Sequence, residues 1–206
     1  MLFRSSAFAG PSEVVVVADG TSPAEFTATD LVAQTEHGPD GMSWLVTWDE
    51  AVADAVDVAL DGVLEDARRG AEIAGTLASS GHCVLVDDEG QALAVVDAIA
   101  PEHLQLMVAA PEALAERVHN AGAVFLGPWT PTSIGDYVAG PSHVLPTAGT
   151  ARFAGALTVA DFTKDVNLVT ADPDALRRLG PYVEALAVAE GLEAHAESIR
   201  VRRQHG

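Results

Sequence analysis

A run of four valines, Val14 to Val17, constrains the fold of this chain more than any other feature. β-Branched residues favour strands, and a run without polar alternation is typical of a strand that is buried on both faces. Such strands occur mainly in parallel sheets that helices cover on both sides. The valine run therefore predicts an α/β fold.

The segments after the valine run alternate between helix and strand patterns. We expect a helix that begins with a capping box at Ser22 and Glu25 and ends before Gly38. Further strands are expected at 42–48, 82–87, 104–108 and 123–127. Further helices are expected at 49–79, with Gly62, Gly70 and Gly75 as weak points, and at 90–100 and 111–120. This alternation predicts a mostly parallel, Rossmann-like sheet with helices on both faces.

The pattern changes towards the end of the chain. We expect residues 1–157 to form a partial Rossmann-like domain that carries most of the functional site. Residues 158–206 are expected to form a linker and a helical tail, in which Glu190 and Gly191 mark a break between two helices.

Charge and cysteine usage exclude several classes of function. The chain has 11 Lys and Arg against 30 Asp and Glu, a formal charge of -19 that would repel a nucleic acid.

No apolar run approaches the ~18 residues of a membrane span, and Met1 to Gly10 is too weakly apolar for a secretory signal. The single cysteine, Cys83, lies in an expected strand, which favours a core thiol over a nucleophile. We therefore expect a cytoplasmic protein.

A dinucleotide-binding fingerprint is absent from the sequence. The stretch that begins at Gly127 follows an expected strand, but it lacks the second and third glycines of the motif. We therefore expect no cofactor-binding residue in this chain.

The segment from Gly135 to Thr147 holds two glycines and two prolines together with Asp136 and His143. It follows neither a helical nor a strand period, so we expect an irregular loop that presents these two side chains to a ligand. The alternative is a tight connection in which Asp136 and His143 only cap the backbone.

Three further positions could carry chemistry. Gln34 and His37 share one face near the end of a helix, where they could bind a metal or substrate, or His37 could simply complement the helix dipole. Glu102 and His103 follow Pro101 and could act as a general acid and base, or they could be solvated polar residues. From spacing alone, His195 in the tail is more typical of an ordinary helix residue.

Together these segments resemble the histidinol dehydrogenase family. The resemblance covers nearly the whole chain in order, and its strongest stretches are Gly10–Glu13, Asp30–Gly38, Ala100–Leu106, Ala121–Gly127, Gly135–Thr147, Gly149–Phe153 and Glu190–Ala196. Several separated motifs in register are far more specific than any one of them.

The resemblance implies zinc-dependent and NAD-linked oxidation of L-histidinol to L-histidine through histidinal, the last steps of histidine biosynthesis. It implies that Glu102 and His103 are the catalytic acid–base pair. It implies one zinc ion per site, held by Gln34, His37, Asp136 and His195. The substrate-binding residues that it implies are Ser12, Gln34, His37, His103, Asp136, His143, Glu190 and His195. Members of the family are homodimers, and the resemblance implies a tail that crosses to the partner's site.

The resemblance covers only the second half of the family's chain. The NAD site is therefore expected mostly on the first half, and the sheet seen here is expected to be incomplete. Ser142 stands where the family usually has Asn, and Asp165 where it usually has a basic residue. Two alternatives stay open: a non-catalytic remnant that binds zinc or a partner, and a family relative that oxidises another small polar alcohol.

Overall fold

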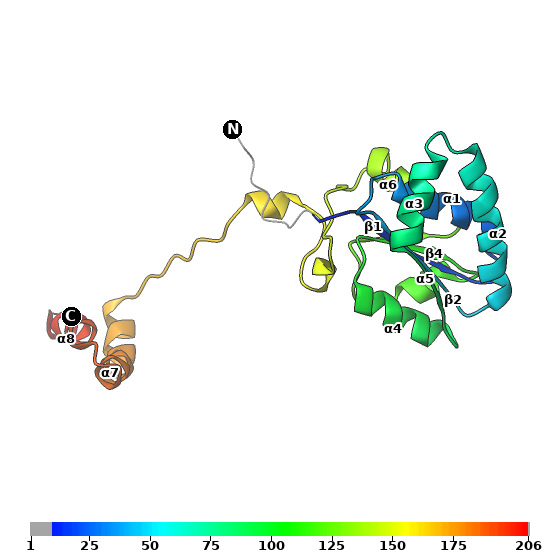
Figure 1. The fold of residues 1–206 in the computed structure, drawn as a ribbon. Coiled ribbons are helices and arrows are strands. Elements are labelled where there is room, and N and C mark those ends of the chain that lie inside the picture. The colour runs from blue at the N-terminus through cyan, green and yellow to red at the C-terminus, as the bar shows by residue number, and fades with distance from the viewer. Residues whose placement is uncertain (1–9, 206) are drawn as a thin grey trace. The chain divides into compact units, whose positions relative to one another are not determined.

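The structure is a computed structural model that describes residues 10–205. The chain divides into two compact units, Met1–Asp161 and Phe162–Gly206 (Figure 1). The first nine residues, where we expected no secretory signal, lie outside the described part of the chain.

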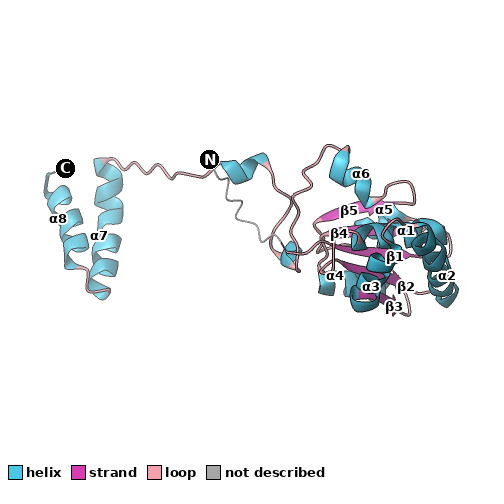
Figure 2. Ribbon diagram, turned by 45° about the horizontal axis from the view of Figure 1, so that its top comes forward, coloured by secondary structure: helices cyan, strands magenta, loops and turns pink. Residues whose placement is uncertain are grey.

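The first unit is built on a parallel sheet, which Figure 2 shows in magenta. Within residues 10–205 the sheet has five strands in the order β3-β2-β1-β4-β5. The strands are β1 (Glu13–Ala18), β2 (Met42–Thr47), β3 (Gly81–Leu85), β4 (His103–Met107) and β5 (Ala123–Leu126). All neighbouring pairs are parallel, and the strand order reverses direction between β1 and β4, as in Rossmann folds. The expected α/β class is confirmed.

Helices cover both faces of this sheet (Figure 1). One face packs against α1 (Ala24–Thr35) and α2 (Glu50–Asp66), and the other against α4 (Glu89–Ile99) and α5 (Pro111–Ala115). The valine run contributes to both faces of the sheet. Val14 and Val16 pack with α1 and α2, whereas Val15 and Val17 pack with α4 and α5. All four are fully buried, so the interpretation of the run as a two-sided strand is confirmed.

The expected capping box at the start of α1 is wrong. The residue that precedes the helix is Pro23, and no side chain caps the first turn. The Ser22 hydroxyl instead lies 2.8 Å from the Thr27 hydroxyl and 3.5 Å from the sulfur of Met107. The serine is therefore engaged with the interior and not with the helix terminus.

The single long helix expected at 49–79 is also wrong. Two helices form, α2 and α3 (Gly70–Ser80), because Ala67 takes an extended conformation after α2. A Cβ added at Gly70 would collide with the carbonyl oxygen of Leu64, so the sharp turn requires glycine there. Arg69 lies in this turn and donates to Glu72 and to the carbonyl oxygen of Glu36, which ties the turn to the end of α1.

The helix expected at 111–120 is shorter than its pattern suggested. Helix α5 ends at Ala115, and the backbone amides of His119 and Asn120 donate to the Asp97 carboxylate at 3.1 and 3.0 Å. Asp97 thus satisfies amides that a longer helix would have bonded internally.

Cys83 was expected in the core, and this is wrong as well. It is exposed, because β3 is an edge strand that pairs only with β2 among the described strands. Partial burial, with a smaller effect of Asp57, raises the pKa of the thiol, which disfavours the reactive thiolate.

The second unit contains α7 (Pro173–Ala189) and α8 (Glu193–His205), which pack against each other. The expected break between them is confirmed, and Gly191 takes a left-handed conformation with φ of +75°. The shorter elements of the chain are α6 (Thr132–Tyr137) and two 3-10 turns, Thr150–Arg152 and Val159–Phe162.

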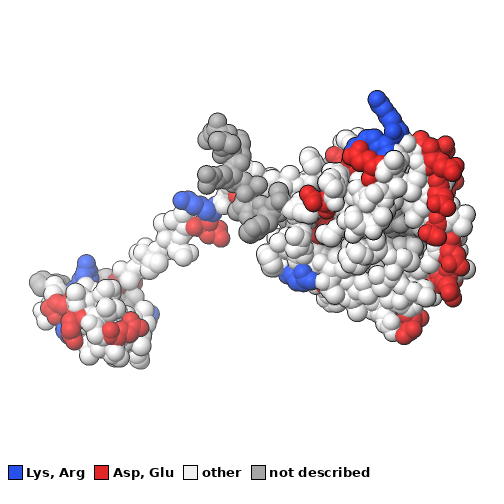
Figure 3. Space-filling model, in the orientation of Figure 1, with Lys and Arg blue, Asp and Glu red and all other residues white. Residues whose placement is uncertain are grey.

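The surface carries the expected negative charge. Figure 3 shows acidic side chains gathered along α2, which bears exposed Glu50, Asp54, Asp57, Asp61, Glu65 and Asp66. In the part of the chain that the structure describes, no helix combines the length and apolar character that a bilayer crossing requires.

Candidate functional site

The polar residues singled out in the sequence gather at the amino ends of two adjacent strands. Ser12 immediately precedes β1, and Glu102 immediately precedes β4. The two strands are neighbours in register, with Val14 opposite His103. Rossmann folds bind nucleotides at the carboxyl ends of their strands. The site described here lies at the opposite edge of the sheet.

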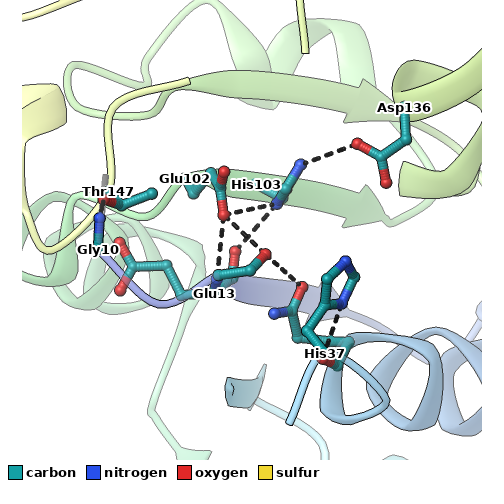
Figure 4. A network of polar contacts seen from close by, with 9 residues as sticks. Gly10, Glu13, His37, Glu102, His103, Asp136 and Thr147 are labelled. Atoms are coloured by element: carbon teal, nitrogen blue, oxygen red, sulfur yellow. Dashed lines mark hydrogen bonds and ion pairs between the residues drawn. The ribbon is translucent and has the colours of Figure 1, made fainter. Parts of the chain in front are cut away.

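Glu102 is the centre of a buried hydrogen-bond network (Figure 4). Its Oε2 atom accepts from the Ser12 hydroxyl at 2.8 Å and from the Glu13 backbone amide at 3.2 Å. The same oxygen lies 3.4 Å from Nδ1 of His103. Glu102 is only 8% exposed, so this carboxyl group is held in place by protein donors and not by bulk water.

The network also defines the tautomer of His103. Its Nδ1 lies 3.2 Å from the carbonyl oxygen of Glu13, which can only accept a hydrogen bond. We therefore assign the proton to Nδ1, which leaves a lone pair on Nε2. Nε2 is buried, makes no hydrogen bond within residues 10–205, and lies 3.7 Å from Oδ1 of Asp136. The ring is thus oriented as a base whose free nitrogen faces Asp136.

A close backbone approach fixes the position of Glu102. The amides of Gly122 and Ala123 donate to the carbonyl oxygens of Pro101 and Glu102, both at 2.9 Å. A Cβ added at Gly122 would lie 2.6 Å from the Glu102 oxygen, so only glycine permits this approach. The segment before β5 therefore locks the connection that carries the two candidate catalytic residues.

The segment 135–147 is not irregular throughout, which corrects the sequence expectation. Its first three residues belong to helix α6, and Asp136 is therefore presented by a helix. A Cβ added at Gly135 would lie 2.6 Å from two ring carbons of Phe125, a residue of β5. This glycine lets α6 pack closely on the sheet and brings Asp136 to His103. His143 lies beyond the helix and is exposed.

The end of α1 supplies two more side chains. Gln34 is 4% exposed; its Oε1 accepts from the Ser12 hydroxyl at 3.3 Å, and its Nε2 has no hydrogen-bond partner among the described residues. His37 is exposed, and its Nδ1 lies 3.2 Å from the carbonyl oxygen of Gln34. That contact leaves Nε2 of His37 available to a ligand.

Two cavities meet at Asp136. The first, of about 340 Å³, is lined by Gln34, His37 and Asp136. The second, of about 210 Å³, is lined by His103, Asp136, Ser142 and His143, with apolar side chains around them. The structure thus brings Gln34, His37, Glu102, His103 and Asp136 into one region, with His143 at its border.

The donors of the first cavity suit zinc, but they do not complete a zinc site. An imidazole nitrogen, a carboxylate and an amide oxygen from His37, Asp136 and Gln34 leave a tetrahedral ion one ligand short. No group of three or more His, Cys, Asp or Glu side chains within residues 10–205 is arranged to hold a metal. His195 and Glu190 belong to the second unit, and both are exposed there.

Two buried acids, one beside the acid–base pair and one on helix α1, were not predicted from the sequence. Glu13 is 2% exposed and contacts both Glu102 and His103 through its backbone. Asp30, on the same helix as Gln34, is 9% exposed; burial raises its pKa to about 6, and the side chain of Gln105 lowers it in part. The signal that could have revealed both is an acidic residue inside a segment whose neighbours are apolar.

Known proteins match the chain over nearly its whole length. A family profile described as "Histidinol dehydrogenase" matches residues 4–203. A histidinol dehydrogenase of Cereibacter sphaeroides is 49% identical over 94% of this chain and 45% of its own length. One from Thermus thermophilus is 46% identical over 95% of this chain and 47% of its own length. The crystal structure of histidinol dehydrogenase from Elizabethkingia anophelis superposes with a TM-score of 0.87 and 34% identity, over 96% of this chain and 45% of that one.

The chain therefore spans about half the length of the curated relatives that it matches.

Proposed function

The chain belongs to the histidinol dehydrogenase family, and from this premise we propose that it forms the acid–base and zinc-binding part of an enzyme that oxidises L-histidinol to L-histidine with NAD. The observation that carries this proposal is the buried Ser12–Glu102–His103 network, with Asp136 facing the free nitrogen of His103. Family membership supports histidinol as the substrate, and the geometry supports the roles of the residues.

We propose that His103 is the base that takes the hydroxyl proton of the alcohol. Its Nδ1 proton is held by the carbonyl oxygen of Glu13, so the lone pair of Nε2 is directed at the cavity that His143 and Asp136 also line. A base whose tautomer is fixed before substrate binds avoids reorganisation during proton transfer.

Glu102 is suited to the second step, in which water attacks the aldehyde-level intermediate. Its Oε2 is occupied by Ser12 and Glu13, which leaves the other carboxylate oxygen to bind and deprotonate a water molecule.

Gln34, His37 and Asp136 would hold a zinc ion through one amide oxygen, one imidazole and one carboxylate, and His195 would supply the fourth donor. Zinc in such a site supplies Lewis acidity and anchors the polar groups of the substrate. Ser12, His143 and Glu190 would contact the substrate beside these ligands.

NAD and a second copy of the chain are the proposed partners. NAD would bind to the part of the relatives' chain that this sequence does not match, since no dinucleotide fingerprint follows any strand here. The enzyme would work in histidine biosynthesis in the cytoplasm, as a homodimer in which the helical tail of one copy brings Glu190 and His195 to the other.

The test combines the purified chain with the unmatched remainder of the Cereibacter sphaeroides relative and measures histidinol-dependent formation of NADH. We expect turnover, and about 10²- to 10⁴-fold less with Glu102→Gln. Absence of NADH from a well-folded, zinc-loaded complex would contradict the proposal and favour a non-catalytic zinc protein. Equal turnover of alcohols that lack the imidazole would contradict histidinol as the substrate.

A further inference from the structure

The end of helix α4 leads directly into the proposed acid–base pair. Ile99 is the last residue of the helix, and only two residues, Ala100 and Pro101, separate it from Glu102. Ala100 ends the helix in a left-handed conformation with φ of +54°, and Pro101 cannot continue the helix because it has no amide hydrogen. The conformation of this short connection therefore decides where the Glu102 carboxyl group lies.

A carbonyl oxygen in the last turn of α4 loses its helical donor because of this connection. In a continuous helix the carbonyl oxygen of Ala98 would accept from the amide of Glu102, four residues on. Glu102 lies outside the helix, and the guanidinium of Arg152 donates to the Ala98 oxygen in its place. The last turn of α4 contains no basic residue, so Arg152 also supplies the positive charge that stabilises a helix C-terminus. Arg152 thus takes over a bond that Glu102 would make if the helix continued.

Arg152 connects this helix end to the turn that contains Thr147. Its Nη1 donates to the carbonyl oxygen of Gly149 at 2.9 Å, while its Nη2 donates to Ala98. The hydroxyl and the amide of Thr150 both donate to the carbonyl oxygen of Thr147, at 2.7 and 3.1 Å, and so close the turn. A guanidinium presents its donors in a rigid fork, so one side chain bridges the two backbone segments.

The same turn contacts the segment that precedes β1. The amide of Gly10 donates to the hydroxyl of Thr147 at 2.6 Å (Figure 4). A Cβ added at Gly10 would lie 2.8 Å from that oxygen, so the two segments approach each other closely. Two residues after Gly10, the Ser12 hydroxyl donates to Oε2 of Glu102 at 2.8 Å. The turn therefore binds both segments of the network, the one that carries Ser12 and the one that leads to Glu102.

We propose that Arg152 is a positioning residue that holds the end of α4 against this turn and so keeps the Glu102 carboxyl group beside Ser12. The inference rests on the proposed function only in taking Glu102 as a catalytic residue. The Arg152 side chain is exposed and bonds backbone oxygens, so it acts through the backbone and is assigned no contact with substrate.

A double-mutant cycle on the full chain tests this coupling. Ser12→Ala should raise the unfolding equilibrium constant of the first unit about tenfold in the unmutated protein, because it removes a hydrogen bond to a carboxylate. In the Arg152→Ala background the same change should raise it less than about threefold, because the Glu102 carboxyl group is no longer held beside Ser12. Urea denaturation followed by tryptophan fluorescence measures these constants, since all three tryptophans of the chain lie in the first unit.

Arg117→Ala is the matched control. Arg117 is also exposed and also contacts α4, but it pairs with Glu89, the first residue of the helix, at 3.0 Å. In this background Ser12→Ala should have the same effect as in the unmutated protein. An arginine that only stabilised α4 would leave the effect of Ser12→Ala unchanged, so an equal effect in all three backgrounds would overturn the inference.

A milder variant covers the case in which Arg152→Ala does not fold. Arg152→Lys then replaces it in the cycle, because lysine keeps the charge but lacks the fork that bridges the two carbonyl oxygens. The effect of Ser12→Ala should again be smaller than in the unmutated protein, and an undiminished effect would overturn the inference.

Kinetics of the complemented enzyme give a second readout. Arg152→Ala should lower kcat at least about tenfold, because a misplaced catalytic group slows the chemical step. Zinc affinity should change less than about twofold, since Arg152 bonds neither Gln34, His37 nor Asp136. Arg117→Ala should change neither quantity. An unchanged kcat of Arg152→Ala in an active complex would overturn the inference.

The double-mutant cycle requires neither zinc, NAD nor histidinol. Equal effects in the cycle, with turnover by the unmutated complex, would overturn the inference and leave the proposed function standing. Coupling in the cycle without turnover by the unmutated complex would contradict the proposed function, but Arg152 would still be the residue that holds Glu102 beside Ser12.

Discussion

The two ends of the parallel sheet use polar side chains in opposite ways. At the carboxyl end, the Asp19 carboxylate accepts from Thr21 and from the amide of Ala109, while Asp49 and Asp88 cap α2 and α4. At the amino end, His103, Gln34 and Glu13 each keep a buried polar atom without a hydrogen-bond partner among the described residues.

This difference supports the proposal that the amino end of the sheet binds the ligand. Buried polar groups are usually paired, and an unpaired one costs about 1–3 kcal/mol. The carboxyl end satisfies its groups locally and so only closes loops. The amino end retains unsatisfied donors and acceptors beside two cavities, which a bound molecule or ion can satisfy. We therefore propose that the ligand site of this chain lies at the edge opposite to the one that Rossmann folds usually use.

The largest expected effect comes from the acid–base pair at the amino end. His103→Asn should lower the turnover of the complemented enzyme about 10²- to 10⁴-fold, because the amide cannot accept the proton. Its thermal unfolding midpoint should change little, since the asparagine side-chain amide can donate to the Glu13 carbonyl oxygen in place of Nδ1, and Nε2 makes no hydrogen bond within residues 10–205. Steady-state kinetics and circular dichroism measure the two effects. If the His103→Asn variant kept its turnover, His103 would not be the base, and the amino end would lose its proposed catalytic role.

Within the first unit, zinc affinity should depend on the amino end of the sheet and not on its carboxyl end. His37→Ala should weaken zinc binding at least about tenfold, because it removes one of the proposed ligands. Asp49→Ala, at the carboxyl end, is the control and should leave the affinity unchanged. Titration with a competing chelator measures both constants. An equal loss in the two variants would show that the zinc site lies elsewhere.

Asp30 should make the stability of the fold pH-dependent. Its pKa is raised to about 6 by burial, opposed in part by Gln105, from 3.8. The folded state therefore favours the protonated carboxyl, and this stabilisation is present below pH ~4 and lost as the pH rises through ~6. Asp30→Asn should remove this dependence and stabilise the protein by about 2 kcal/mol at pH 7, after an allowance for residual solvent.

Urea denaturation between pH 4 and 7 measures this dependence. Glu25→Gln, an exposed carboxyl on the same helix, is the control and should keep the pH dependence of the unmutated protein. An Asp30→Asn curve parallel to that of the unmutated protein would contradict the assignment.

The smallest expected effect is at the carboxyl end. Asp19→Ala should destabilise the fold by about 1 kcal/mol, because the amides of Thr21 and Ala109 lose their acceptor but remain close to water. Turnover and zinc affinity should not change. A loss of turnover or of zinc affinity in the folded Asp19→Ala variant would mean that the carboxyl end also binds a ligand.

Much of the sheet could be predicted from the sequence, because local patterns determine it. The valine run, the later strands and the break at Gly191 depend on residues close together in the chain. The break between α2 and α3 falls at Gly70, one of three glycines expected to weaken the long helix. Which of the three becomes a turn could not be predicted, since Ala67 and Arg69 favour helices and the turn depends on packing against α1.

The individual residues of the candidate site could be named from the sequence, but their arrangement in space could not. Asp136 lies on helix α6, which packs closely on β5 at Gly135 and Phe125. These two residues belong to different elements, so no local sequence pattern reveals their contact. The backbone of Glu13 contacts Glu102 and His103, which lie about 90 positions away in the sequence, and no local spacing reveals these contacts. Cys83 resembled a core residue because the pattern of a strand does not say whether it lies at an edge.

The most direct test of the central claim is a zinc titration of the ¹⁵N-labelled chain, followed by the side-chain amide of Gln34 and the ring nitrogens of His37, His103 and His195. We expect zinc to shift Gln34, His37 and His195 together, to perturb His103 through Asp136, and to leave the backbone amides that Asp19 and Asp49 cap unchanged. Shifts that begin at the carboxyl end of the sheet, or that spare Gln34 and His37, would contradict the assignment of the ligand site to the amino end.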